Sequence, residues 1–350
     1  MLSTATLGGS LVKRLAENPP QTNAPNGLAI LLFLGDLILF LPVFFIIAYT
    51  LDYVYPTLAA VEDPLPAYEA LPLNDDGTPK ADNERVHTAQ PGKPITSSIR
   101  ATNRLIRSVG HGWLANFRGL GYYILTSIIV GITTGLFALP PFIPLRVALL
   151  PALILCAPLI TTWTHLVITG PSNKSFFARI PPLKKTYLAT WFPTLLLWAA
   201  MLTATIVPTL LARAIGLRAT NPGEIRTDPP RRADAGKALG VLGVSIALQA
   251  LLLIPAITAI TRVMASLLPA DEDAIVPFDR SFGGRVEPEV VTGKGFATFG
   301  AALKSIPRAS WARIYLLRVK VFAVAVAAYL AMGAIVVAQF LLVASLGGSK

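Results

Sequence analysis

The chain is poor in the residue types that build soluble active sites and disulfide frameworks. Its 350 residues include one cysteine, three histidines and only 14% charged residues. One cysteine excludes a disulfide framework and a cysteine-rich zinc site. The histidines, His87, His111 and His165, do not have the spacing of a metal site. Because soluble domains carry about a quarter charged residues, this composition excludes an ordinary soluble enzyme.

The sequence also lacks the short motifs that carry common chemistry. We find no phosphate-binding loop, serine-hydrolase elbow or zinc-protease helix. We therefore predict that the protein is not an enzyme and has no catalytic residue, no metal ligand and no cofactor.

Hydrophobic residues make up 53% of the chain, and they gather in long runs. A helix needs about 20 mostly apolar residues to cross the hydrocarbon core of a bilayer. Six runs are long enough: 28–50, 121–139, 145–169, 187–212, 238–260 and 321–346. Three prolines at 140–144 separate the second run from the third by a tight turn. The sequence predicts an all-α polytopic membrane protein with about six transmembrane helices.

The remaining sequence divides into a tail, loops and surface segments. Basic and aromatic residues precede the second, fourth and sixth runs, which favours three helical hairpins, although such residues flank many spans. The predicted organisation is an N-terminal tail at 1–27, a transmembrane helix at 28–50, a disordered loop at 51–95, an amphipathic interfacial segment at 96–120, a four-helix membrane region at 121–260, a cytoplasmic loop with an amphipathic segment at 261–320 and a transmembrane helix at 321–346.

The net charge of +11 lies beside the apolar runs, so we expect a membrane partner and no nucleic acid. Loops 51–120, 170–186 and 261–320 carry twenty of the thirty Lys and Arg residues. The positive-inside tendency therefore places these loops in the cytosol and both termini on the other side. We expect a protein of the endoplasmic reticulum and endomembranes or of the plasma membrane, and mitochondrial targeting is the less favoured alternative.

Two loop segments have the pattern of helices that lie on an anionic membrane surface. Apolar side chains recur at helical spacing from Ile99 to Phe117, with arginines on the complementary face. Such a helix buries its apolar face among lipids and attracts acidic headgroups. The predicted surface residues are Arg100, Arg104, Arg107 and Trp113 in the first segment and Lys304, Arg308 and Trp311 in the second.

Asp36 is the only acidic residue inside a predicted span. Acids at this depth normally face a partner or a cavity. Counting 1.5 Å per residue, we place Asp36, Thr203, Gln249 and Gln339 about 10–16 Å from the membrane surface that bears the termini. Such a polar layer would suit the site of a small-solute or ion transporter. The alternative is structural, since interhelical hydrogen bonds of this kind also hold helices together.

Three smaller patterns have weaker implications. Leu65, Pro66 and Tyr68 form a short Pro–Tyr motif of the kind that WW domains bind. Gly131 and Gly135 have the spacing of closely packed helices. Six prolines interrupt the spans, at positions 42, 151, 158, 193, 208 and 255, and broken helices occur at transporter sites as well as in ordinary kinked helices.

The passage Ile275-Val276-Pro277-Phe278-Asp279-Arg280-Ser281-Phe282-Gly283-Gly284-Arg285-Val286 resembles an uncharacterised family of multi-pass membrane proteins of filamentous fungi, some of which carry a ubiquitin-carrier-type label. The resemblance implies a membrane protein and no established activity. Ubiquitin conjugation needs an exposed, activated thiol, whereas the sole thiol, Cys156, lies inside a span. We expect a turn-rich loop here, with Phe278 and Phe282 at the bilayer edge.

The leading interpretation is a non-enzymatic integral membrane protein that acts as a scaffold, adaptor or membrane organiser. Its basic cytoplasmic loops would contact anionic lipids and protein partners. The alternative is a small-solute or ion transporter that uses the polar layer around Asp36.

Overall fold

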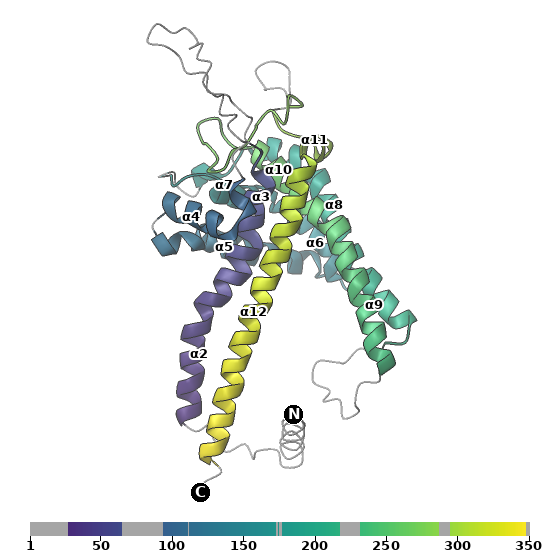
Figure 1. Cartoon of the computed structure of the whole chain (residues 1–350). Helices are drawn as coiled ribbons and strands as arrows, with labels where there is room; N and C mark the ends of the chain where they lie inside the picture. Colours follow the sequence, from purple (N-terminus) through teal and green to yellow (C-terminus); the bar gives the residue numbers. More distant parts are fainter. Residues whose placement is uncertain are drawn as a thin grey trace, which may run out of the picture. The chain divides into compact units, whose positions relative to one another are not determined.

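The structure is a computed structural model that describes residues 27–64, 94–110, 112–172, 174, 177–217, 232–286 and 295–347 (Figure 1). These residues are about 79% helical. Apart from one isolated bridge between Thr169 and Ala274, the described residues contain no strand pairing. Five described helices are long and apolar enough to cross a membrane, or six if a bent pair is one span. The predicted all-α polytopic class is confirmed.

The helices follow one another in the order α2 (Gly27–Phe45), η1 (Ile46–Val54), α3 (Tyr55–Val61), η2 (Ile95–Ser97), α4 (Ile99–Val109), η3 (Gly112–Phe117), α5 (Leu120–Phe137), α6 (Leu145–Leu155), α7 (Ala157–Ile168), η4 (Phe177–Arg179), α8 (Leu183–Ala214), α9 (Arg232–Leu248), η5 (Gln249–Leu253), α10 (Ile254–Ser266), α11 (Phe299–Lys304) and α12 (Arg308–Gly347). The chain forms two compact units. We call residues 46–322 the central unit, and we call α2 together with α12 from Ala323 the terminal unit.

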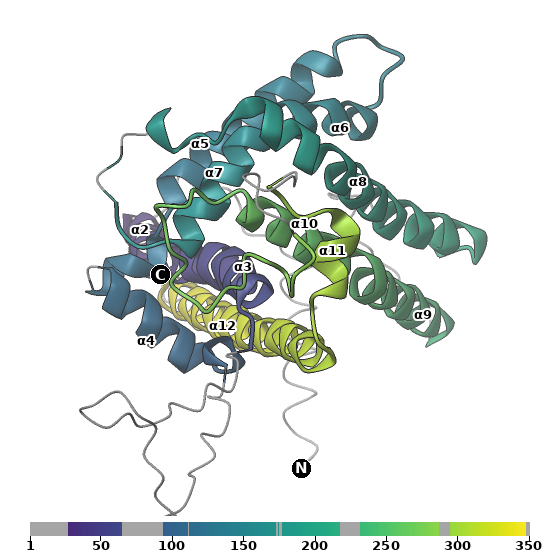
Figure 2. The same cartoon turned by 90° about the horizontal axis from the view of Figure 1, so that it is seen from above.

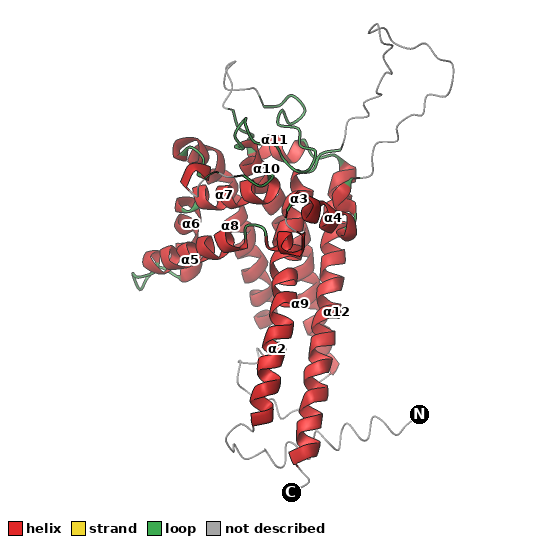
Figure 3. Ribbon diagram, turned by 90° about the vertical axis from the view of Figure 1, so that its left-hand side faces the viewer, coloured by secondary structure: helices red, strands yellow, loops and turns green. Residues whose placement is uncertain are grey.

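The terminal unit consists of two apolar helical segments. In Figures 1 and 3, α2 and the second part of α12 run side by side. Large side chains such as Phe33, Ile38 and Phe340 are exposed, and burying such surface among lipid chains is favourable. One polar contact joins the two segments, because Gln339 Nε2 donates to Asp36 Oδ1 at 2.8 Å.

Prolines explain the irregular helices of the central unit. The π-helices η1 and η5 end two residues before Pro56 and Pro255, and the break between α6 and α7 falls two residues before Pro158. A proline ring clashes with the carbonyl four residues earlier and provides no N–H for it, so the preceding turn widens or breaks. At Cys156 the chain bends by 65° between α6 and α7.

Side chains from other helices satisfy carbonyls beside these breaks. Arg318 Nη1 donates to the carbonyl of Asp52 at 3.2 Å, and this is the carbonyl that the ring of Pro56 displaces. Tyr187 Oη donates to Leu155 O at 3.1 Å beside the α6–α7 break. In η5, Tyr315 Oη donates to Ala250 O at 2.7 Å. Backbone groups freed within a membrane need such partners, so these contacts stabilise the broken helices.

The described helices extend further than the apolar runs predicted. Helical backbone continues from α2 through η1 and α3 to Val61, so residues 51–61 are not a disordered loop. The last helix begins at Arg308, within the segment assigned to a cytoplasmic loop. Helices α5 and α6, and likewise α8 and α9, are consecutive and pack together as two hairpins. The third pairing joins α2 to α12, which are not consecutive.

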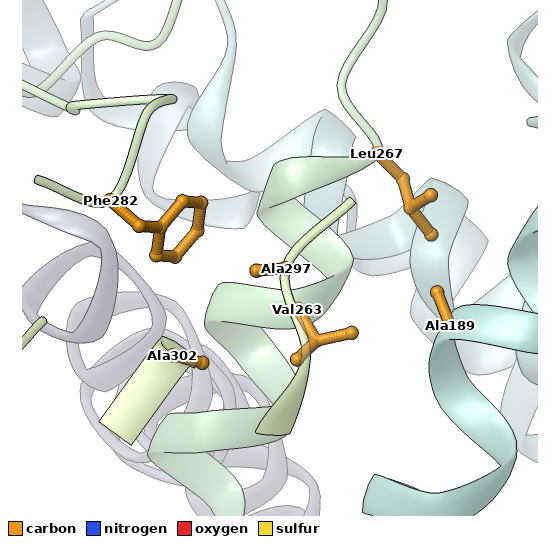
Figure 4. Close-up of a cluster of buried hydrophobic side chains, with 6 residues drawn as sticks. All are labelled: Ala189, Val263, Leu267, Phe282, Ala297 and Ala302. Atoms are coloured by element: carbon orange, nitrogen blue, oxygen red, sulfur yellow. The ribbon is translucent and has the colours of Figure 1, made fainter. Parts of the chain in front are cut away.

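The core of the central unit surrounds α10, which packs against α3, α7, α8 and α11 (Figure 2). Figure 4 shows its apolar contacts, where Val263 of α10 and Leu267, the residue after its end, lie in one buried cluster with Ala189 of α8 and Phe282 of the following loop. Alanines 297 and 302 complete this buried cluster. Small side chains allow α11 and α8 to approach α10 closely, and the large ring of Phe282 fills the remaining space.

Candidate functional site

Among the described residues, buried acidic and basic side chains gather at the end of α3. Two consecutive acids, Glu62 and Asp63, follow this buried helix. Arg313 of α12 lies 3.1 Å from Glu62 and Arg262 of α10 lies 2.9 Å from Asp63, nitrogen to oxygen. Glu62 is 2% exposed and Arg262 is 1% exposed. Buried charges persist only when they are paired and hydrogen-bonded, so these pairs hold three helices together.

The same arginines also cap α3. Arg313 Nη2 donates to the carbonyl of Glu62 at 2.6 Å, and Arg262 Nη1 donates to the carbonyl of Ala60 at 3.0 Å. The last carbonyls of a helix have no partner within the helix and carry a partial negative charge. The two cations therefore offset both this charge and that of the neighbouring acids. We call Glu62, Asp63, Arg262 and Arg313 the buried ion-pair cluster.

Glu62 also fixes the entry to α4. Its carboxylate accepts hydrogen bonds from the backbone N–H groups of Ile95 and Thr96, at 2.6 and 3.0 Å. Lys320 of α12 donates to Ser97 O at 2.9 Å. The start of α4 is therefore anchored to α3 and α12.

The loop at 277–286 closes over the ion-pair cluster. Asp63 Oδ2 accepts from the backbone N–H of Asp279 at 3.0 Å. Burial raises the pKa of the Asp279 carboxyl, but hydrogen bonds from Ser281 and the Gly283 N–H more than offset this, and the pKa lies below its ordinary value. Phe282, Gly283 and Gly284 all have left-handed φ angles, of 53°, 68° and 74°. The glycine pair therefore serves the predicted turn.

The expected position of the two phenylalanines was wrong. Phe282 is 1% exposed and packs in the core of the central unit, and Phe278 packs against the same cluster. The guanidinium carbon of Arg262 lies 5.1 Å from the centre of the Phe282 ring and 5.9 Å from that of Phe278. Cation–π attraction is strongest where water is excluded, and this cation draws the rings into the protein and away from lipid.

The three basic loops meet in the structure. Ile275 N donates to Ile168 O at 2.7 Å, and Lys174 Nζ contacts Asp271 and Glu272 at 2.7 and 2.8 Å. Asp63 N donates to Pro277 O at 2.8 Å. Parts of loops 51–120, 170–186 and 261–320 thus lie on one side of the central unit, as the sequence-based topology requires.

The predicted amphipathic segment at 96–120 is not one continuous helix. The helix ends at Val109, and the chain resumes as the short 3₁₀ helix η3. Thr102 and Ile106 face the protein interior. Arg100, Arg104 and Arg107 are exposed on the opposite face. The second predicted set is also at the surface, with Lys304 and Arg308 exposed and Trp311 half-buried.

In η3, Trp113 is 48% exposed and packs edge-on against Phe117, with ring centres 5.2 Å apart. Leu114 beside it is 66% exposed. Apolar side chains therefore remain available next to the arginine face, but they belong to η3 and not to the face of α4.

Of the predicted polar layer, the structure brings together Asp36 and Gln339 through the hydrogen bond within the terminal unit. Thr203 Oγ1 instead donates to Ala199 O of its own helix at 2.9 Å. Gln249 is exposed at the start of η5. A threonine that bonds back to its helix has no hydroxyl proton left for a solute.

A cavity of about 520 Å³ lies between η1, α5, α6 and α7. One end is aromatic, where the ring centre of Tyr53 lies 5.0 Å from that of Tyr123 and 6.4 Å from that of Trp163. Trp163 Nε1 donates to Tyr49 Oη at 3.0 Å. Trp163 and His165 are both buried.

The glycine pair of α5 was also misinterpreted. A Cβ atom added at Gly131 or Gly135 would meet nothing within 4 Å, so no described helix packs closely at either position. Gly131 lines the cavity instead. Cys156 is 3% exposed, and its Sγ lies 3.9 Å from Thr133 Oγ1. The Pro–Tyr motif of Leu65, Pro66 and Tyr68 lies outside the described residues.

Comparisons of the chain with protein-family models, curated proteins and solved structures find no match.

Proposed function

We propose that the protein is a non-enzymatic membrane organiser that binds anionic lipids of the cytoplasmic leaflet through its basic loop surface. Its helices are compatible with an integral membrane protein. The observation that carries the proposal is the exposed arginine face of α4, whose other face is buried. Hydrogen bonds from the Ile95 N–H to Glu62 and from Lys320 to Ser97 O anchor the residues just before this helix, which suits a fixed binding surface better than a moving gate.

A scaffold or adaptor function would use the same side of the molecule. The exposed Lys304 and Arg308 provide a second basic surface there, open to acidic lipids or to an acidic protein partner. The burial of Cys156 speaks against a ubiquitin carrier, because such an enzyme presents its thiolate to a partner. We place the protein in the endoplasmic reticulum and endomembranes or in the plasma membrane.

Replacing Arg100, Arg104 and Arg107 by glutamine should weaken the binding of anionic lipid about a hundredfold. Each arginine near the membrane surface contributes roughly 1 kcal/mol of attraction. The measurement is titration of fluorescent phosphatidylserine against the whole protein in nanodiscs of otherwise neutral lipid. The salt dependence of binding should flatten as well.

The control compares two single arginine-to-glutamine variants, which remove the same charge at different places. Arg213→Gln alters an exposed arginine at the far end of α8 and should leave the titration unchanged, whereas Arg104→Gln should weaken it about fivefold. Equal effects of these two variants would show that net charge, and not the α4 face, attracts the lipid.

The transporter alternative predicts a different response to Asp36→Asn. The hydrogen bond from Gln339 survives this change in altered form, because an amide oxygen still accepts it. For a membrane organiser we therefore expect the Asp36→Asn protein to keep its localisation. Its level in cells and its affinity for anionic lipid should stay within twofold of those of the unchanged protein. Loss of growth or solute accumulation in cells, with normal protein levels, would favour transport.

Gln339→Leu, which leaves Asp36 without its hydrogen-bond donor, should lower the free energy of unfolding by about 1–3 kcal/mol.

A further inference from the structure

We propose that the cavity between η1, α5, α6 and α7 binds a sterol-class lipid, with its hydroxyl group at the aromatic end. This site is separate from the basic surface of α4. Its volume of about 520 Å³ falls within the range of about 300–1,000 Å³ that is typical of small-molecule sites. Such sites combine a mostly apolar lining with a few polar groups that orient the ligand, and this cavity has both.

The walls come from regularly spaced side chains on two helices. Helix α5 presents Tyr123, Ser127 and Gly131, which are four residues apart and therefore share one face. Helix α6 presents Leu145, Leu149 and Leu153 at the same spacing. The small residues of α5 leave space opposite the leucines of α6. The 65° bend before Pro158 turns α7 so that Trp163 reaches the end of this space.

The lining determines the chemical class of the ligand. Among the described residues that line the cavity, none is charged. The polar groups are the hydroxyls of tyrosine, serine and threonine and the indole N–H of Trp163, which already donates to Tyr49. An anionic or zwitterionic headgroup would lose its hydration here without gaining an opposite charge. A hydroxyl can both donate to and accept from Tyr123 and Ser127. The ligand is therefore neutral and has a hydroxyl headgroup.

Access and shape favour a rigid membrane lipid. Helix α5 belongs to a segment apolar enough to cross the membrane, and its exposed Ile128 and Ile132 suit contact with lipid. The occupant can therefore enter from the bilayer. Flat aromatic faces at one end and the bare surface of Gly131 match a fused-ring body. Such a body loses less conformational entropy on binding than a flexible acyl chain.

The test uses a photoactivatable sterol in liposomes that contain the whole protein. Gly131→Leu adds a side chain where a Cβ meets nothing within 4 Å, so it should fill the cavity without a clash and reduce labelling of the 120–168 region at least tenfold. Gly135→Leu is the matched control, because it adds the same side chain one turn away at a position that does not line the cavity. It should leave labelling unchanged.

A second variant tests the position of the hydroxyl. Tyr123→Phe keeps the ring and removes one hydrogen-bonding group, so binding of the sterol should weaken about fivefold, while binding of its methyl ether should change less than twofold. Equal labelling of the Gly131→Leu and Gly135→Leu proteins would overturn the proposal. So would labelling by a photoactivatable diacylglycerol that excess sterol does not displace, because the cavity would then bind acyl chains.

Discussion

Glu62→Ala should lower the free energy of unfolding by about 3–5 kcal/mol, one of the two largest effects that we expect from a single change. The substitution leaves Arg313 without its carboxylate partner and removes the acceptor of the Ile95 and Thr96 N–H groups. An uncompensated charge at 8% exposure is strongly destabilising. Unfolding by SDS in mixed micelles, followed by tryptophan fluorescence, measures this loss.

Two further variants sharpen the comparison. Arg313→Met should be less harmful than Glu62→Ala, because Glu62 keeps its hydrogen bonds from Ile95 and Thr96. Asp52→Ala breaks an exposed ion pair with Arg318, in which the aspartate side chain is 54% exposed. It should therefore cost less than about 1 kcal/mol. If Glu62→Ala is no worse than Asp52→Ala, the buried cluster does not stabilise the fold.

Hydropathy predicted which segments are helical membrane spans more accurately than where the helices end. A run of apolar residues indicates a helix that can be solvated by lipid, and it ends where charge begins. The helices continue past that point because Glu62 and Asp63 neutralise Arg313 and Arg262 inside the protein. Composition does not show this pairing, since the ion-paired residues Glu62 and Arg313 lie 251 positions apart.

The arginine face of α4 and the cavity differ in how well the local sequence pattern predicts them. The arginine face of α4 follows from helical spacing alone, and Arg100, Arg104 and Arg107 are exposed in the structure, whereas their contact with a membrane stays a prediction. The cavity was missed because its small residues, Ser127 and Gly131, are equally compatible with close helix packing. Only the arrangement of α6 and the bend at Cys156 decide between a packed interface and a cavity. Pro158, which lies two residues after Cys156, is the one local signal of that bend.

Phe282→Ala should cost about 3–5 kcal/mol of unfolding free energy, because it removes a buried ring and leaves a cavity. The ring also lies over Arg262, with 5.1 Å between the guanidinium carbon and the ring centre, so the cation loses part of its surroundings. Phe142→Ala is the control, since that ring is 81% exposed, and it should change stability by less than about 0.5 kcal/mol.

The backbone conformation of residue 282 predicts an unusual order of stability among its variants. Glycine normally destabilises relative to alanine by about 0.5–1 kcal/mol. Phe282, however, has a φ of 53°, and this left-handed conformation costs a residue with a Cβ roughly 1–2 kcal/mol. Phe282→Gly should therefore be more stable than Phe282→Ala by up to about 1.5 kcal/mol in the same unfolding experiment. The opposite order would show that the loop relaxes to a right-handed conformation once the ring is gone, so that the burial of Phe282 and not the glycine pair maintains the turn.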